Sequence, residues 1–208
     1  MRNLWVFGDS YSCDWNKVVA KGHKEYVEKY NPISHFSNII KDTYHFDKVY
    51  NISESGNCNY SILESICKYI NDIEDTDYVI IGWSEITRWR CLSLNKNKWK
   101  VVGVNFNEAS TELRNESISR DSKITIDEVN NWITLLNKTL PNQILHWTPF
   151  QSLKNDLGLN VCTPPFHMKR INEEYNIKDT HITEEGHIDI SKWMIDIIND
   201  KPITKKVI

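Results

Sequence analysis

The sequence lacks a long apolar segment, and the short apolar run after Met1-Arg2 cannot form the apolar region of a signal peptide. We therefore expect no membrane partner. The expected location is cytoplasmic or virion-associated. The chain also lacks an excess of charge, with a net charge of -3 and a pI near 6.2. Because its basic residues are dispersed, we expect no nucleic-acid partner.

Cysteine pairs and metal-ligand spacings are also missing. The five cysteines are odd in number and none forms a CxxC pair, which argues against a disulfide framework or a zinc site and favours a reducing compartment. No metal-ligand spacing occurs among His23, His35, His45, His146 and His167. We therefore expect neither a metal nor a cofactor, and the oligomeric state is left open.

Apolar runs of strand length alternate with helical patterns along the chain. Strands are predicted at residues 4–7, 46–52, 77–81 and 143–147, and helices at about 34–43, 61–73, 125–140 and 183–199. Residues 12–33 are predicted to form a long loop or short insertion. Residues 91–122 are predicted to form a variable loop or lid, with a short strand or hairpin arm at 98–102. The alternation predicts one α/β domain over residues 1–208, a three-layer α/β/α fold with a mostly parallel sheet.

The first strand and its turn contain the first candidate nucleophile. Four apolar residues favour a strand buried on both faces, and Gly8-Asp9-Ser10 ends it at the carboxyl edge of the sheet. Gly56 and Gly82 also follow predicted strands, although the chain has only seven glycines. Because glycine lets a bound group approach the backbone closely, these turns predict a site that includes Ser10. The alternative is a polar turn that only closes the strand.

Together with motifs further along, these turns resemble the SGNH hydrolase superfamily, the GDSL-type esterases. Gly8-Asp9-Ser10 is similar to the nucleophile block and Gly56-Asn57 to the second block. Gly82-Trp83-Ser84-Glu85 falls where the family has Gly-x-Asn-Asp. Asp179-Thr180-His181, followed by Gly186-His187, is similar to the last block. The blocks span the chain in the family's order, and the resemblance implies a flavodoxin-like sheet.

The resemblance implies a catalytic triad of Ser10 as nucleophile, His181 as base and Asp179 as the carboxylate that orients the imidazole. A serine hydroxyl becomes an effective nucleophile only when a base takes its proton, and histidine is largely neutral at working pH. His187 is the rival base, but its place inside the last predicted helix favours a packing or capping role.

The resemblance also implies an oxyanion hole that contains the backbone N–H groups of Ser10 and Gly56. The chain departs from the family in the third block, where Ser84 replaces the oxyanion asparagine. Similar substituted third blocks occur in phage-encoded relatives, which this chain resembles in that respect. The last block reads Asp-x-His instead of Asp-x-x-His. Ser84 is the candidate replacement donor, with Asn57 or Asn59 as alternatives. Loss of one such donor lowers the rate roughly a hundred- to thousand-fold, so activity depends on the replacement.

Asp9, Trp83 and Arg88 are the candidate substrate-binding residues. Arg88 suits an anionic substrate, with a solvated loop as the alternative, and Asp9 is otherwise a structural carboxylate of its turn. Tryptophans beside a cleft would stack on sugar rings, whereas buried ones would belong to the core. The tryptophans in loop-like surroundings are Trp15, Trp83, Trp89 and Trp99.

These residues favour a serine esterase that removes a small acyl group such as acetate through an acyl-enzyme. Its expected partner is a small ester or acylated glycan. The alternative is a protein that keeps the fold with weak or no catalysis, for instance a binding protein or a viral structural component.

Overall fold

The computed structural model describes residues 2–86, 88–93, 98–102, 122–140, 143–150 and 161–200. Five strands form one sheet in the order β2-β1-β3-β6-β7, and all of its pairings are parallel. The strands are β1 (Leu4–Phe7), β2 (Val49–Asn51), β3 (Tyr78–Gly82), β6 (Gln143–Trp147) and β7 (Val161–Cys162). The α/β class with a parallel sheet is therefore confirmed.

The strand order determines where a ligand site is expected. Taken in chain order, the five strands are arranged 2-1-3-4-5, as in flavodoxin-like folds. In these sheets the winding reverses between the first and third strands, and ligands bind outside the carboxyl ends of the strands at that point. Ser10 follows β1 and Arg88 follows β3, so both lie at this edge.

Alternating side chains of the central strands fill a core on each face of the sheet. Leu4 and Val6 belong to one buried cluster, whereas Trp5 and Phe7 belong to the other. Successive strand residues point to opposite faces, so a strand covered on both sides has apolar residues throughout. This explains why β1 has no polar position.

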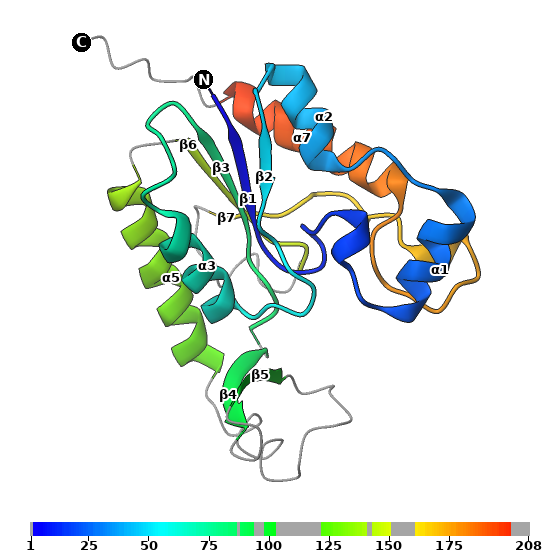
Figure 1. Ribbon diagram of the computed structural model, residues 1–208, viewed down its shortest axis with the longest axis horizontal. Helices are drawn as coiled ribbons and strands as arrows, with labels where there is room; N and C mark the ends of the chain where they lie inside the picture. The colour runs from blue at the N-terminus through cyan, green and yellow to red at the C-terminus, as the bar shows by residue number, and fades with distance from the viewer. Residues whose placement is uncertain are drawn as a thin grey trace.

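Helices cover both faces of the sheet (Figure 1). Helices α2 (Phe36–Tyr44) and α7 (Glu184–Asp200) pack on one side, and α3 (Asn59–Tyr69) and α5 (Ser122–Thr139) on the other. These are the three layers expected from the sequence. The Thr183 hydroxyl accepts a hydrogen bond from the Gly186 N–H at 3.1 Å, so it caps the start of α7.

The segment expected to be a loop between β1 and α2 contains two helices. A short 3-10 helix, η1 (Trp15–Lys17), precedes α1 (Lys21–Tyr30). The loop prediction for residues 12–33 was wrong because it overlooked apolar positions at helical spacing, including Tyr26 and Tyr30. Tyr26 is 1% exposed and packs with Ile171 and Ile177 in a small third cluster.

The remaining elements refine the expected boundaries. Strands β4 (Trp89–Ser93) and β5 (Lys98–Val102) form an antiparallel hairpin, and the rest of the segment 91–122 lies outside the described residues before Ser122. Helix α5 begins at Ser122, about one turn before the start predicted at residue 125. Strand β7 and the one-turn helix α6 (Ile171–Glu174) are not among the elements predicted from the sequence. None of the helices described is both long and apolar enough to span a bilayer.

Candidate active site

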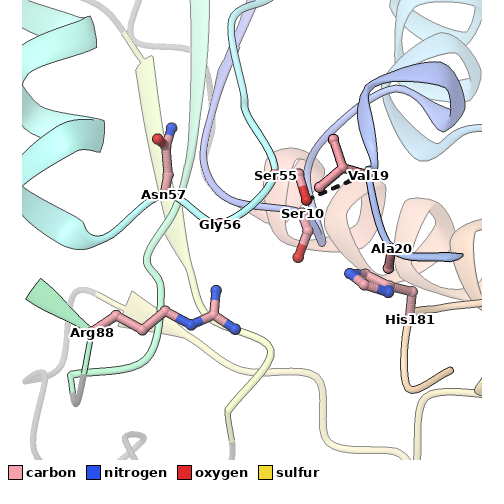
Figure 2. A pocket seen from close by; sticks show the side chains of 8 residues that line it. All are labelled: Ser10, Val19, Ala20, Ser55, Gly56, Asn57, Arg88 and His181. Atoms are coloured by element: carbon pink, nitrogen blue, oxygen red, sulfur yellow. Dashed lines mark hydrogen bonds between the residues drawn. The ribbon is translucent and has the colours of Figure 1, made fainter. Parts of the chain in front are cut away.

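A cavity of about 440 Å³ lies at the carboxyl edge of the sheet (Figure 2). It combines residues from the turns after β1 and β2, the segment before α1, the segment after β3 and the loop before α7. Its lining residues are Ser10, Val19, Ala20, Ser55, Gly56, Asn57, Arg88 and His181. Residues from both ends of the chain therefore meet in one pocket, as the resemblance implied for Ser10 and His181.

The turn that carries Ser10 is fixed by hydrogen bonds from neighbouring segments. Asn57 Nδ2 and the Glu54 N–H each donate to the Gly8 carbonyl at 3.2 Å. A Cβ at Gly8 would lie 2.5 Å from Ser12 Oγ, so no larger residue fits there without a shift. Ser10 itself is 8% exposed and faces the cavity.

His181 and Asp179 form the tightest polar contact of the site. His181 Nδ1 lies 2.6 Å from Asp179 Oδ1, and the same oxygen accepts the His181 N–H at 2.7 Å. Burial opposes ionisation of Asp179, but these hydrogen bonds outweigh it and keep its pKa below the usual value. An ionised carboxylate only accepts hydrogen bonds, so Nδ1 must carry the ring proton. The other ring nitrogen is then free to accept a proton.

The ring of His181 extends toward Ser10 across the cavity in Figure 2. Figure 2 marks no hydrogen bond between these two side chains, and such bonds often tighten only in the substrate complex. The loop of His181 is anchored by backbone bonds. The Ile171 N–H donates to the His181 carbonyl at 3.0 Å, and the Asn172 N–H donates to the Asp179 carbonyl at 2.8 Å.

Helix α1 supports this loop from behind. Gly22 lies so close to it that a Cβ there would be 2.7 Å from the Lys178 carbonyl oxygen and 2.8 Å from Asp179 Cβ. The ring of His23 lies 5.4 Å from that of His181, centroid to centroid. These contacts were not predicted, because the residues of α1 were expected to form a loop.

Further buried histidines lie close to His181. His187, the rival base, is 4% exposed and lies 4.5 Å from His35 and 4.6 Å from Trp15 between ring centroids. It does not line the cavity, which fits the expected packing role. His23 Nδ1 and His187 Nδ1 have no hydrogen-bond partner among the described residues. Burial lowers the pKa of His23 to about 4 and that of His35 to about 3, and it lowers the pKa of His187 well below the usual value.

Two backbone N–H groups of cavity residues, those of Ser10 and Gly56, are candidate hydrogen-bond donors to a ligand. Gly56 lines the cavity with a φ of 83°, a conformation that favours glycine. Within the described contacts, the N–H groups of Ser10 and Gly56 have no protein acceptor. The Asn57 side chain is a poorer candidate, because its amide donates to Gly8 and points away from Ser10 in Figure 2.

Ser84 is not placed as the sequence led us to expect. It is fully buried, and its hydroxyl donates to Asp9 Oδ2 at 2.9 Å. Asn59 bonds both the N–H and the carbonyl of Ser84, at 2.7 and 3.0 Å, so Asn59 is not a free donor either. The expectation that the Ser84 hydroxyl faces the oxyanion is corrected, because this hydroxyl donates its hydrogen bond to Asp9 instead.

Asp9 is also corrected from a substrate ligand to an internal carboxylate. It is 1% exposed and accepts hydrogen bonds from the Tyr11 N–H at 3.0 Å, from Ser84 Oγ and from Arg88 Nη1 at 3.3 Å. Burial raises the pKa of Asp9, and the neighbouring Arg88 guanidinium acts in the opposite direction. Arg88 itself lines the cavity, with 21% of its side chain exposed, so it stays a candidate substrate contact.

Trp83 does not reach the cavity. It is fully buried in the same cluster as Val79 and Ile81, and its Nε1 donates to His146 Nδ1 at 3.2 Å. The prediction of substrate contact by Trp83 was wrong, because the alternation of β3 continues to residue 83. Trp15 packs among the buried histidines, and the side chains of Trp89 and Trp99 lie outside the described part of the chain.

The described residues include no group of three or more His, Cys, Asp or Glu side chains that could hold a metal ion. What the cavity does bring together is a hydroxyl, an imidazole bonded to an ionised carboxylate, two backbone donors and a guanidinium. This set of groups suits acyl transfer by a serine nucleophile.

Solved structures of several esterases share this fold with the chain at low sequence identity. The acetyl xylan esterase Est2A from the rumen bacterium Butyrivibrio proteoclasticus matches with a TM-score of 0.55 and 12% identity. The match covers 96% of this chain and 64% of that one, so this chain spans less than two thirds of that esterase.

Two further structures match over nearly the whole chain. The psychrotrophic esterase EstA from Pseudoalteromonas sp., in a form inhibited by monoethylphosphonate, has a TM-score of 0.51 and 12% identity over 95% of this chain and 97% of its own. A second match is a carbohydrate esterase whose active site displays divergent catalytic and non-catalytic binding functions. Its TM-score is 0.52 and its identity 13%, and the match covers 97% of this chain and 69% of that one. No family profile and no curated protein matches the sequence.

Proposed function

We propose that this protein is a serine esterase that hydrolyses a small acyl ester, such as an acetyl group on a carbohydrate, through Ser10, His181 and Asp179. The observation that carries the proposal is the 2.6 Å contact between His181 Nδ1 and Asp179 Oδ1 beside a cavity that His181 shares with Ser10. Acetyl xylan esterase and carbohydrate esterase neighbours in fold support this substrate class.

In the acylation step, Ser10 Oγ attacks the ester carbonyl carbon while its proton passes to the free nitrogen of His181. The carbonyl π electrons move to oxygen, and the backbone N–H groups of Ser10 and Gly56 stabilise that oxyanion. Asp179 fixes the ring tautomer and stabilises the imidazolium. The intermediate collapses when the alcohol leaves with the proton of His181, which leaves Ser10 acylated.

Water then reverses the sequence. The oxygen of a water molecule attacks the acyl carbon while His181 takes a proton from that water. His181 then returns the proton to Ser10 Oγ, which leaves as the free hydroxyl while the acid is released. Val19 and Ala20 form an apolar wall of the cavity close to Ser10 and His181. A cavity of about 440 Å³ with this wall suits a short acyl group attached to a sugar-sized alcohol.

A fluorophosphonate labelling experiment tests the nucleophile. We expect a mass increase on the peptide that contains Ser10, together with hydrolysis of an aryl acetate and release of acetate from acetylated xylo-oligosaccharides. Ser10→Ala should abolish labelling and hydrolysis. Ser55→Ala is the matched control, because Ser55 lines the same cavity without a place in the mechanism, and it should keep both.

Two outcomes would contradict the proposal. Hydrolysis that persists in folded Ser10→Ala would rule out Ser10 as the nucleophile. A folded wild-type protein that neither labels nor hydrolyses any of these esters would instead support the alternative, a binding or structural protein with this fold.

A further inference from the structure

Arg88 contributes the one cationic side chain among the cavity residues that the structure describes. It comes from the segment after β3, and Figure 2 shows its guanidinium extending into the cavity toward Ser10. Gly56 and Arg88 lie on one side of Ser10 in this view, and His181 lies on the other. A carbonyl oxygen that points away from the base would therefore point toward Gly56 and Arg88.

The guanidinium is held in place from behind. Its Nη1 lies 3.3 Å from Asp9 Oδ2 and 3.4 Å from Ser84 Oγ, and its Nε lies 3.9 Å from Glu85 Oε2. A guanidinium has five N–H donors in one plane, so contacts at Nη1 leave other donors for the cavity. Asp9 thus binds both the Ser84 hydroxyl, which was expected to stabilise an oxyanion, and the Arg88 guanidinium.

We propose that Arg88 is a catalytic residue that donates a hydrogen bond to the oxyanion, the function first assigned to Ser84. The inference rests on the proposed esterase function and extends it. When Ser10 attacks, a full negative charge develops on the carbonyl oxygen. A prepositioned cationic donor stabilises that charge more strongly than the neutral Ser84 hydroxyl would, and it needs little reorganisation. In this arrangement Asp9 is a positioning residue, since it contacts Arg88 and not the substrate.

The test uses two aryl esters, a neutral acetate and a hemisuccinate that carries a carboxylate. Arg88→Gln should lower kcat on both esters by roughly a hundred-fold or more with KM changed only a few-fold, because the lost interaction is made in the transition state. Arg88→Lys keeps a positive charge beside Asp9, so it guards against loss of folding. Since lysine lacks the planar fork, its kcat should fall by at least about ten-fold. Circular dichroism checks that each variant is folded.

Controls separate this role from others. Lys21→Gln removes an exposed cation next to Ala20 but outside the cavity, and it should leave kcat unchanged. Adding guanidinium chloride to Arg88→Ala should partly restore hydrolysis of the neutral acetate. Asp9→Asn should lower kcat on the neutral acetate without a matching rise in KM.

The results distinguish the two proposals. If wild type labels at Ser10 but Arg88→Gln and Arg88→Lys keep wild-type kcat on the neutral acetate, the role of Arg88 is refuted and the esterase stands. A KM effect confined to the hemisuccinate also refutes it, because Arg88 would then bind a substrate anion. If Arg88→Gln does not fold, the kcat of Arg88→Lys decides alone. Failure of wild type to label or hydrolyse refutes the esterase itself.

Discussion

Acid should destabilise this protein through three buried histidines, His23, His35 and His187. The pKa of His23 is lowered to about 4 and that of His35 to about 3, and the pKa of His187 lies well below 6.5, in each case mainly by burial. At about pH 5.5 they are neutral in the folded protein, whereas most imidazoles of the unfolded chain are protonated. Unfolding then takes up protons, so the free energy of unfolding falls as the pH drops from about 6.5 toward 4.

The size of the effect follows from one proton per histidine. Each contributes a slope of at most about 1.4 kcal/mol per pH unit, so the three together contribute about 4 kcal/mol per pH unit. A drop of one pH unit in this range would therefore remove a large part of the free energy of unfolding of a typical domain, which is about 5–15 kcal/mol. His187→Leu removes one of the three groups, so its slope should be smaller by about 1.4 kcal/mol per pH unit.

Urea unfolding followed by tryptophan fluorescence at several pH values between about 5 and 7 measures this slope. His45→Asn is the matched control, because His45 is exposed and its φ of 53° is one that asparagine also adopts. The control should keep the wild-type slope even if its stability changes by a constant amount. Equal slopes in wild type and His187→Leu would refute the reasoning.

Two further substitutions test the frame of the site. Asp77 is 2% exposed and accepts hydrogen bonds from the Asn3 N–H, Trp5 Nε1 and the Glu74 N–H, at 2.7, 2.8 and 3.1 Å. Asp77→Ala should lower the free energy of unfolding by about 3 kcal/mol, because it leaves donors without an acceptor, and a loss under about 1 kcal/mol would contradict this. In Gly56→Ala the new methyl group meets no atom within 4 Å, but alanine would have to adopt the positive φ of Gly56. Urea unfolding should therefore show a free energy of unfolding lower by about 1–2 kcal/mol. Unchanged stability would mean that the turn is not held in that conformation.

Local patterns in the sequence were enough to predict the sheet. The apolar runs of β1 and β3 indicated strands buried on both faces, and residues 143–147 form β6 with the predicted bounds. Helix α1 was missed because Gly22 and many charged residues conceal its apolar face. Strand β7 has only two residues, so no periodicity could reveal it.

The chemistry of the site was harder to predict than its location. Gly8-Asp9-Ser10 and His181 were expected at one edge and line or adjoin one cavity, whereas three side-chain roles near them were misassigned. Trp83 could have been placed in the core, because Val79 and Ile81 share its parity along β3. The partners of Ser84 could not be foreseen, because Asp9 and Asn59 lie far from it in the chain and reach it only through the fold.

The close approach of Gly22 to Asp179 makes a helix without any reacting group part of the working geometry. A methyl group at position 22 would have to occupy space now filled by the Lys178 carbonyl and the Asp179 Cβ, so α1 and the loop that carries Asp179 would have to move apart. The imidazole is bonded to that carboxylate and would move with it. Variation of this protein, natural or in the laboratory, is thus constrained at an inconspicuous lysine-rich helix for as long as its chemistry depends on Asp179.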